Sequence, residues 1–187
     1  MKNLTKFTLC FSKCMEILCW IADALAALVM VFSVFFRGWL EEQMRFSTTI
    51  PDINIRGLSM AMANGQPSGA SITFSTLAGV VLLGLSAMIF RNIYLILKTA
   101  QGETKFSKGS TPFQADVTRM VREIGIFLIS TSVVNLIWSI GMRFILGVDS
   151  VELSVELDSA LIGMMVICLS QFFDYGAKLQ QDVDGLL

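Results

Sequence analysis

A few ionisable and amide side chains interrupt long apolar runs of the sequence, namely Asp23, Arg91, Gln171 and Asp174. A charged group inside a bilayer costs free energy unless it is paired, so such residues either join helices or form a site for a ligand, an ion or a proton. Asp23 lies about eight residues after the start of the first apolar run and Arg91 about six residues before the end of the second, so their depths from the same side of the membrane nearly match. We therefore expect these four residues to form an intramembrane polar cluster with an Asp23–Arg91 pair. The alternatives are that Arg91 snorkels to the headgroups or meets Asp174.

The chain has no histidine and four cysteines. Without histidine, haem–histidine ligation, most zinc sites and all Ser-His or Cys-His triads are excluded. Cys10, Cys14, Cys19 and Cys168 show neither CxxC spacing nor a second cluster that would bind zinc. We expect these thiols to be reduced and buried, and the alternative is acylation of Cys10 or Cys14 at the membrane surface. The sequence thus indicates no catalytic residue, no metal and no cofactor.

The composition places the chain in a bilayer. Hydrophobic residues make up 54% and charged residues 16% of the 187 residues, and the mean hydropathy of +0.67 is too high for a soluble domain of this length. Apolar runs at residues 15–36, 72–97, 124–146 and 159–175 are long enough to cross a membrane. The first run is too long for a signal peptide and contains Glu16 and Asp23, so we expect it to remain in the protein. The sequence predicts one all-α membrane domain over residues 1–187, a bundle of four transmembrane helices.

Two connections, residues 37–71 and 147–158, have strand-like patterns. Residues 44–62 are rich in β-branched and alternating residues, and residues 151–158 alternate strictly between apolar and polar. Because a lone hairpin is marginal in water, we expect these two loops to pair into a small extracytoplasmic β element. The alternative for residues 151–158 is an additional helical turn before the fourth span, since Leu153, Leu157 and Leu161 recur at four-residue spacing.

The connection at residues 98–123 is basic and turn-rich. Thr111, Pro112 and Gln114 have the pattern of an N-cap, a first helical position and a capping box, so a helix should begin there. This connection is either an ordinary solvated linker or a docking surface for a soluble partner. The candidate docking residues are the cationic and aromatic side chains Lys105, Lys108, Phe113, Arg119 and Arg122. With a net charge of −1, the chain lacks the concentrated basic patch that direct nucleic-acid binding requires.

Lysine and arginine concentrate on one side of the predicted bundle. Lys2, Lys6 and Lys13 precede the first span, and the 98–123 connection adds further cations, whereas acidic residues balance or outnumber arginine in the other two connections. By the positive-inside rule, both termini and the 98–123 connection are expected to be cytoplasmic. The tail at residues 176–187 is then also cytoplasmic.

Two stretches of the sequence resemble a known family. Residues 109–113 (GSTPF), followed by Val117, Arg119, Arg122 and the pair Ile124-Gly125, resemble the hinge-to-helix signature of the bacterial membrane proteins catalogued as domain of unknown function 2975. Residues 173–187 are similar to that family's YG-x-x-LQ-x-D-x-D ending. The resemblance implies a four-span protein of the bacterial inner membrane, often encoded beside a small helix-turn-helix regulator. It assigns no catalytic residue.

Two functions remain open on these observations. The first is a non-enzymatic sensor or regulatory partner, in which the 98–123 connection and the tail contact a cytoplasmic helix-turn-helix regulator. The second is a small membrane carrier or enzyme that uses the cluster of Asp23, Arg91 and Asp174. We favour the first, because a carrier of this size would have to form a homo-oligomer and the sequence shows no broken helix or inverted repeat.

The distribution of lysine predicts the topology. Cysteines introduced by Ser107→Cys and Gln181→Cys are expected to be protected from a membrane-impermeant thiol reagent applied outside the cell, and one introduced by Ser68→Cys is expected to react. The measurement is labelling of intact cells. Reaction of the cysteine at position 107 from outside would reverse the whole orientation.

Overall fold

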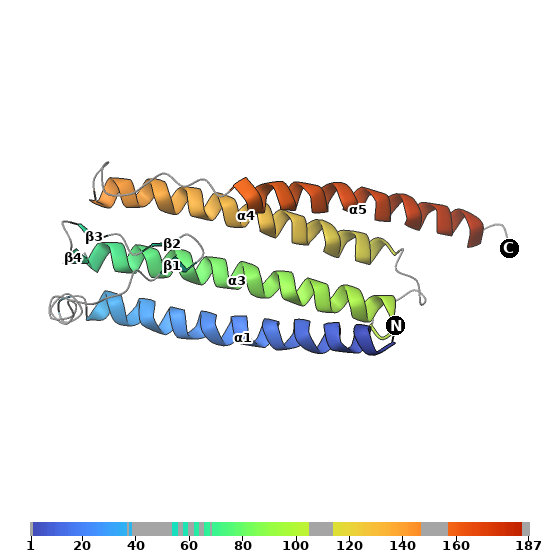
Figure 1. Ribbon diagram of the computed structural model, residues 1–187, viewed down its shortest axis with the longest axis horizontal. Coiled ribbons are helices and arrows are strands. Elements are labelled where there is room, and N and C mark those ends of the chain that lie inside the picture. Colours follow the sequence, from blue (N-terminus) through green and yellow to red (C-terminus); the bar gives the residue numbers. More distant parts are fainter. Residues whose placement is uncertain are drawn as a thin grey trace. The chain divides into compact units, whose positions relative to one another are not determined.

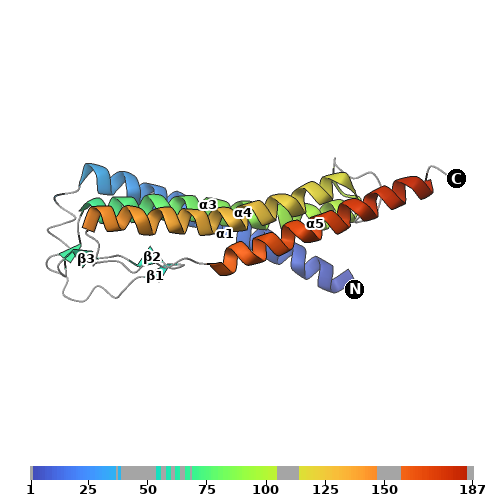
Figure 2. The same ribbon diagram turned by 90° about the horizontal axis from the view of Figure 1, so that it is seen from above.

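The computed structural model describes residues 2–36, 38, 54–55, 58–59, 62–63, 66–67, 69–104, 114–146 and 157–184. Four long helices dominate these residues: α1 (Lys2–Phe35), α3 (Gly69–Ala100), α4 (Ala115–Leu146) and α5 (Leu157–Asp184) (Figure 1). Each helix is long and apolar enough to cross a membrane, and each runs without a break between its ends, as Figure 2 also shows. The chain is therefore an all-α, multi-pass membrane protein, as its composition predicts.

The helices extend beyond the apolar runs that predict them. Helix α1 begins at Lys2 instead of near residue 15, and α5 continues to Asp184 through most of the segment predicted as a tail. No proline interrupts either extension, and Lys178 pairs with Asp174 one turn earlier on α5 at 2.8 Å, so polar sequence can continue the helix. Helix α4 begins at Ala115; the predicted cap at residues 111–113 lies outside the described residues.

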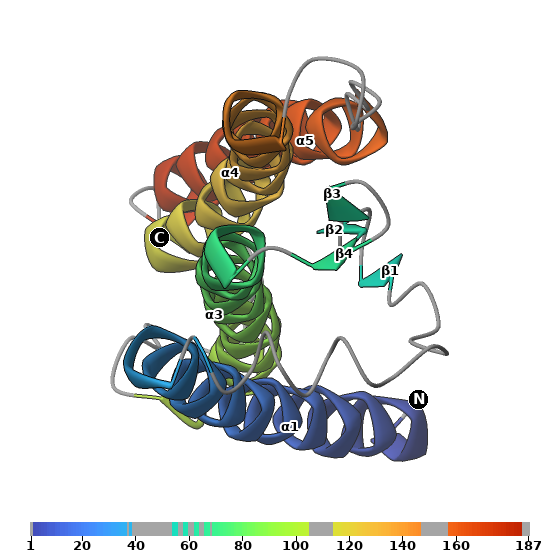
Figure 3. The ribbon, with the colours of Figure 1, turned by 90° about the vertical axis from the view of Figure 1, so that its left-hand side faces the viewer.

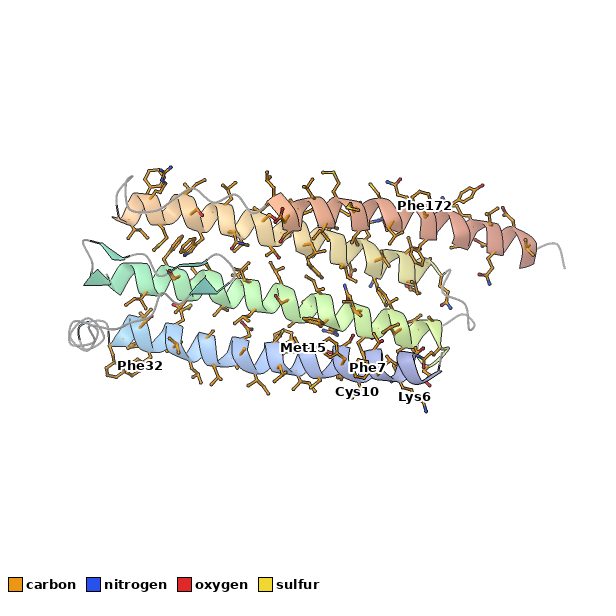
Figure 4. The ribbon with its side chains drawn as sticks, viewed as in Figure 1. Lys6, Phe7, Cys10, Met15, Phe32 and Phe172 are labelled. Carbon is orange, nitrogen blue, oxygen red and sulfur yellow. The ribbon has the colours of Figure 1, made fainter. Side chains whose placement is uncertain are left out.

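On α1, burial is inverted relative to a helix of a soluble protein. On α1 the buried side chains are the polar ones of Ser12, Glu16 and Ser33. Large apolar side chains lie on the exposed faces of their helices. Figure 4 shows this for Phe32 and Phe172, which are 41% and 72% exposed. Apolar side chains are stable in hydrocarbon, whereas polar groups there must be satisfied within the protein. This distribution fits helices that are surrounded by lipid.

The chain divides into two compact units. The first consists of Met1–Cys19, Leu85–Ser130 and Asp158–Leu187, and the second of Trp20–Gly84 and Thr131–Leu157. In the second unit, the buried apolar core comes from α3 and α4 and consists of Ala78, Leu82, Trp138 and Met142, with Phe74 and Val134 packed against it. The helices of this unit are therefore held partly by ordinary side-chain packing.

Hydroxyl groups add polar contacts to the second unit. Trp138 Nε1 donates a hydrogen bond to Ser75 Oγ at 3.2 Å, which joins α4 to α3. The hydroxyls of Ser33 and Thr73 lie 3.3 Å apart and join α1 to α3. Such bonds satisfy side chains that would otherwise be left unpaired in an apolar environment.

In the first unit, α4 and α5 approach each other at two glycines. A Cβ atom on Gly125 would lie 2.7 Å from the carbonyl oxygen of Gly163 and 2.6 Å from Ile167 Cγ1. Conversely, a Cβ atom on Gly163 would lie 2.7 Å from the carbonyl oxygen of Gly125. The two backbones touch directly, which is the close packing that small residues permit between membrane helices.

Helix α3 ends in a Schellman motif centred on Gly102. The amide of Glu103 donates to the carbonyl of Lys98 at 3.2 Å, the amide of Gly102 donates to the carbonyl of Thr99 at 3.1 Å, and Gly102 has a φ of 80°. Glycine adopts this left-handed conformation without the steric cost that a Cβ atom imposes. The hydroxyls of Thr99 and Thr104 also lie 2.9 Å apart. The motif therefore fixes the first residues of the connection, Glu103 included, against the end of α3.

The strands that the structure describes are short and local. Strands β1 (Asn54–Ile55) and β2 (Leu58–Ser59) pair antiparallel, and so do β3 (Met62–Ala63) and β4 (Gln66–Pro67) (Figure 3). Each strand pairs with its sequence neighbour, and α5 already begins at Leu157. The predicted sheet between the two loops is thus not supported: Leu157 and Asp158 are helical, in line with the alternative of an additional turn, and residues 147–156 lie outside the described part of the chain.

The glycine contact between α4 and α5 predicts a large effect of a single methyl group. We expect Gly125→Ala and Gly163→Ala each to destabilise the protein by about 1 to 3 kcal/mol, because overpacking forces the backbones apart. The matched control is Gly79→Ala, where a Cβ atom would meet nothing within 4 Å; there alanine should be neutral or stabilising, since glycine is unfavourable inside a helix. Equilibrium unfolding in mixed detergent micelles measures all three variants. Equal stability of the three would contradict the close approach.

Candidate functional site

A polar network joins α3 and α4 within the first unit. Asn92 Nδ2 donates a hydrogen bond to Glu123 Oε2 at 3.1 Å, and Arg119 Nε lies 3.2 Å from Glu123 Oε1. Asn92 is buried, with 7% of its surface exposed, whereas the side chains of Glu123 and Arg119 are 36% and 65% exposed. The Glu123 carboxylate therefore connects a buried amide on one helix with an exposed guanidinium on the other.

The helix lengths place Asn92 and Glu123 opposite each other. Asn92 lies eight residues before the end of α3 at Ala100, and Glu123 lies eight residues after the start of α4 at Ala115. At 1.5 Å per residue, both are about 12 Å from the connection that joins the two helices. Arg119 is one turn before Glu123 on the same face of α4, which suits an i, i+4 ion pair.

This network can hold helices together, and its geometry offers little for acid–base catalysis. Each oxygen of the Glu123 carboxylate already has a nitrogen donor within 3.2 Å. A general base needs an oxygen directed at the proton that it removes. The arrangement instead resembles the interhelical hydrogen bonds that satisfy polar side chains within membrane proteins.

The predicted polar cluster is divided between the two units. Asp23 belongs to the second unit, and Arg91, Gln171 and Asp174 belong to the first. Arg91 and Gln171 are exposed, and Asp174 Oδ2 pairs with Lys178 Nζ on its own helix. In the part of the chain that the structure describes, no hydrogen bond or ion pair joins Arg91, Gln171 and Asp174 to one another. The Asp23–Arg91 pair stays a prediction.

Glu16 is the buried acid of α1 in the first unit. It is 7% exposed, and Lys13 Nζ lies 2.9 Å from its Oε2. The Lys13 ammonium lies 5.1 Å from the centroid of the Tyr94 ring, so Lys13 on α1 is level with Tyr94 on α3. Glu16 lies three residues deeper than Lys13 on α1, and Arg91 lies three residues deeper than Tyr94 on α3, so Arg91 is level with Glu16. Asp23 lies about 10 Å further along α1 than Glu16, and within the described residues its buried Oδ1 atom has no hydrogen-bond partner.

Two of the predicted docking residues lie in the described part of the chain. Arg119 and Arg122 are exposed on consecutive turns at the start of α4. Lys105, Lys108 and Phe113 lie outside the described residues. We call the exposed surface formed by Arg119 and Arg122 the α4 arginine face.

The cysteines are free thiols, but they are not buried as the sequence predicts. Cys10, Cys14 and Cys168 are exposed, and Cys19 is partly exposed. The prediction was wrong because a thiol is apolar enough to face lipid, and the buried faces of these helices are occupied by small polar residues instead. Within the described ranges, no group of three histidine, cysteine, aspartate or glutamate residues could hold a metal ion.

Sequence reasoning missed Asn92 and the role of Glu123. The signal that could have found Asn92 is the helical periodicity of α3. Thr99 is buried, and because it lies two turns after Asn92, a period of 3.6 residues places the two on the same side of α3 and turns Arg91 away from it. An asparagine on the polar face of a membrane helix predicts an interhelical hydrogen bond.

No family model, curated protein or solved structure matches the chain. The resemblance to the family catalogued as domain of unknown function 2975 therefore stays a prediction.

The Asn92–Glu123 contact predicts an energetic coupling between α3 and α4. We expect Asn92→Ala and Glu123→Ala each to lower the free energy of unfolding, and the double variant to lose less than the sum, with a coupling of about 0.5 to 1.5 kcal/mol. The same cycle with Arg119→Ala and Glu123→Ala is the control, and its coupling should be smaller because that ion pair is largely exposed. Unfolding in mixed micelles gives both couplings. If the losses at Asn92 and Glu123 simply add, the hydrogen bond does not join the helices.

Proposed function

We propose that this chain is a non-enzymatic regulatory membrane protein that binds a cytoplasmic helix-turn-helix regulator through the α4 arginine face. The observation that carries the proposal is the exposure of Arg119 and Arg122 on consecutive turns of a helix that is tied to α3 by the partly buried Asn92–Glu123 hydrogen bond. Two exposed guanidinium groups on a fixed helix suit the acidic surface of a soluble protein, because arginine forms directional bonds with carboxylates.

The use of the polar residues also supports a non-enzymatic role. The interhelical contacts of Asn92 with Glu123, Ser75 with Trp138, and Ser33 with Thr73 engage polar groups in holding the helices together. A membrane enzyme or carrier would instead need polar groups directed at a substrate. We therefore place the activity at the end of the helices, where charges are exposed.

The proposal includes a location and an origin. Following the lysine distribution and the positive-inside rule, we place the start of α4, the 98–123 connection and both termini in the cytoplasm. The resemblance of residues 109–125 and 173–187 to a bacterial family supports assignment to a bacterial inner membrane, with the regulator encoded nearby.

Photo-crosslinking in living cells tests the proposed contact. A photoreactive amino acid at position 122 is expected to form an adduct with the helix-turn-helix regulator encoded beside this chain. The matched control is position 137, where the native Ile137 is 59% exposed within the apolar part of the same helix and should contact only lipid. The adducts are identified by mass spectrometry.

A binding measurement with purified components completes the test. In lipid nanodiscs, the double variant Arg119→Gln/Arg122→Gln should bind the purified regulator at least fivefold more weakly than the native chain, and added salt should weaken native binding. Circular dichroism checks that the variant keeps its helices. Equal binding by the two proteins, or adducts at position 122 with lipid alone, would remove the α4 arginine face as the docking surface.

A further inference from the structure

A groove of about 470 Å³ lies between α1 and the C-terminal end of α3, within the first unit. Leu9, Lys13 and Ile17 line it from α1, Tyr94 and Lys98 line it from α3, and Glu103 lies at its end. Its volume falls in the range of small-molecule sites, roughly 300 to 1,000 Å³. Cys10 and Cys14 also line the groove and are exposed, so it opens on the outer surface of the two helices.

Two lysine ammonium groups lie close to one aromatic ring in this groove. Lys13 Nζ and Lys98 Nζ lie 5.1 Å and 5.7 Å from the centroid of the Tyr94 ring. Lys13 donates one of its three N–H groups to the Glu16 carboxylate. Lys98 makes no ion pair with any residue that the structure describes. The two lysines thus provide donors and positive charge for an anionic group such as a phosphate.

The backbone of an acidic residue is fixed next to these lysines. The Schellman motif at the end of α3 bonds the amide of Glu103 to the carbonyl of Lys98, which holds Glu103 at the outer end of the groove. Like Lys98, Glu103 has no ion-pair partner among the described residues. The groove therefore presents cations in its middle and an anion at one end.

The order of these groups follows the order of the parts of a phospholipid. Lys13 is level with Tyr94, Lys98 lies one helical turn further out, and Glu103 lies beyond it, whereas Ile17 lies one turn deeper than Lys13. The candidate spans of 31 and 29 residues in α1 and α3 are longer than the about 20 residues that cross the hydrocarbon. Their ends therefore reach the headgroup layer, where tyrosine and lysine are most stable.

We propose that this groove binds one phospholipid whose headgroup carries an amine beyond its phosphate, the chemistry of phosphatidylethanolamine. The phosphate sits between Lys13 and Lys98, the headgroup ammonium meets the Glu103 carboxylate, and one acyl chain lies along the apolar wall that includes Ile17. The exposed opening at Cys10 and Cys14 lets the lipid enter sideways from the bilayer.

The position of Glu103 distinguishes this lipid from an anionic one. Phosphatidylglycerol has the same phosphate but no cation to face the carboxylate, so Glu103 would repel its net negative charge. A headgroup with phosphate and ammonium matches both signs of charge in the groove. Selectivity between the two lipids therefore depends on Glu103, and affinity for either depends on Lys98.

Native mass spectrometry of the delipidated full-length protein in detergent tests the proposal. Phosphatidylethanolamine with palmitoyl and oleoyl chains should bind at least fivefold more tightly than phosphatidylglycerol with the same chains. Lys98→Gln should weaken both lipids at least threefold, whereas Glu103→Gln should weaken only phosphatidylethanolamine and abolish the preference. Lys6→Gln is the matched control, because Lys6 is an exposed lysine near the same end of α1 that does not line the groove (Figure 4).

Three outcomes would overturn the proposal. Equal binding of the two lipids would remove the role of Glu103, and an equal effect of Lys98→Gln and Lys6→Gln would show attraction to the cationic helix end alone. Competition by glycerophosphoethanolamine, which lacks acyl chains, at the same concentration as the lipid would show that the apolar wall does not contribute. Helical content and thermal unfolding of each variant exclude a general loss of structure as the cause of weaker binding.

Discussion

A polar group that leaves water for the interior of a bilayer must find its partner within the protein, and the arrangement of this chain depends on that constraint. Three of the contacts that cross between helices are accordingly polar: Asn92 bonds to Glu123, Trp138 bonds to Ser75, and the hydroxyls of Ser33 and Thr73 lie close together. Apolar side chains gain little from contact with one another here, because lipid tails are equally apolar. This is why α1 buries its serines and Glu16 and leaves its phenylalanines outside.

Since hydrophobic burial contributes little to helix association in lipid, close packing has to contribute more. At the Gly125–Gly163 contact, α4 and α5 bring their backbones together, which increases dispersion contacts along both helices. The core around Trp138 and Met142 in the second unit shows that side-chain packing of the ordinary kind is present as well. Interhelical hydrogen bonds at a few positions and close packing at small residues elsewhere thus hold the helices together.

The sequence predicts the helices because each one appears in it as a long apolar run. That signal does not depend on which other helix packs against it. It predicts the polar contacts poorly, because a contact depends on which face each helix turns to its neighbour. Asp23, Arg91 and Asp174 attract attention as charges, yet Asn92 and Glu123 make the bond between helices, and Arg91 is exposed. The strand-like pattern of residues 151–158 misled for a related reason: alternation with Leu157 at its end also suits the first turn of a helix, and α5 begins there.

The polar side chains of the first unit fall into two groups, and the difference bears on what each can do. Asn92 and Glu123 are satisfied within the chain, so their free energy of interaction is already committed to the fold. Lys98 and Glu103 lie at and just beyond the end of α3, without an ion pair among the described residues. A group with unused donors or acceptors near the headgroup layer can bind an external partner without first breaking an internal bond. Binding is therefore favoured at the helix ends, and the interior is favoured for structure.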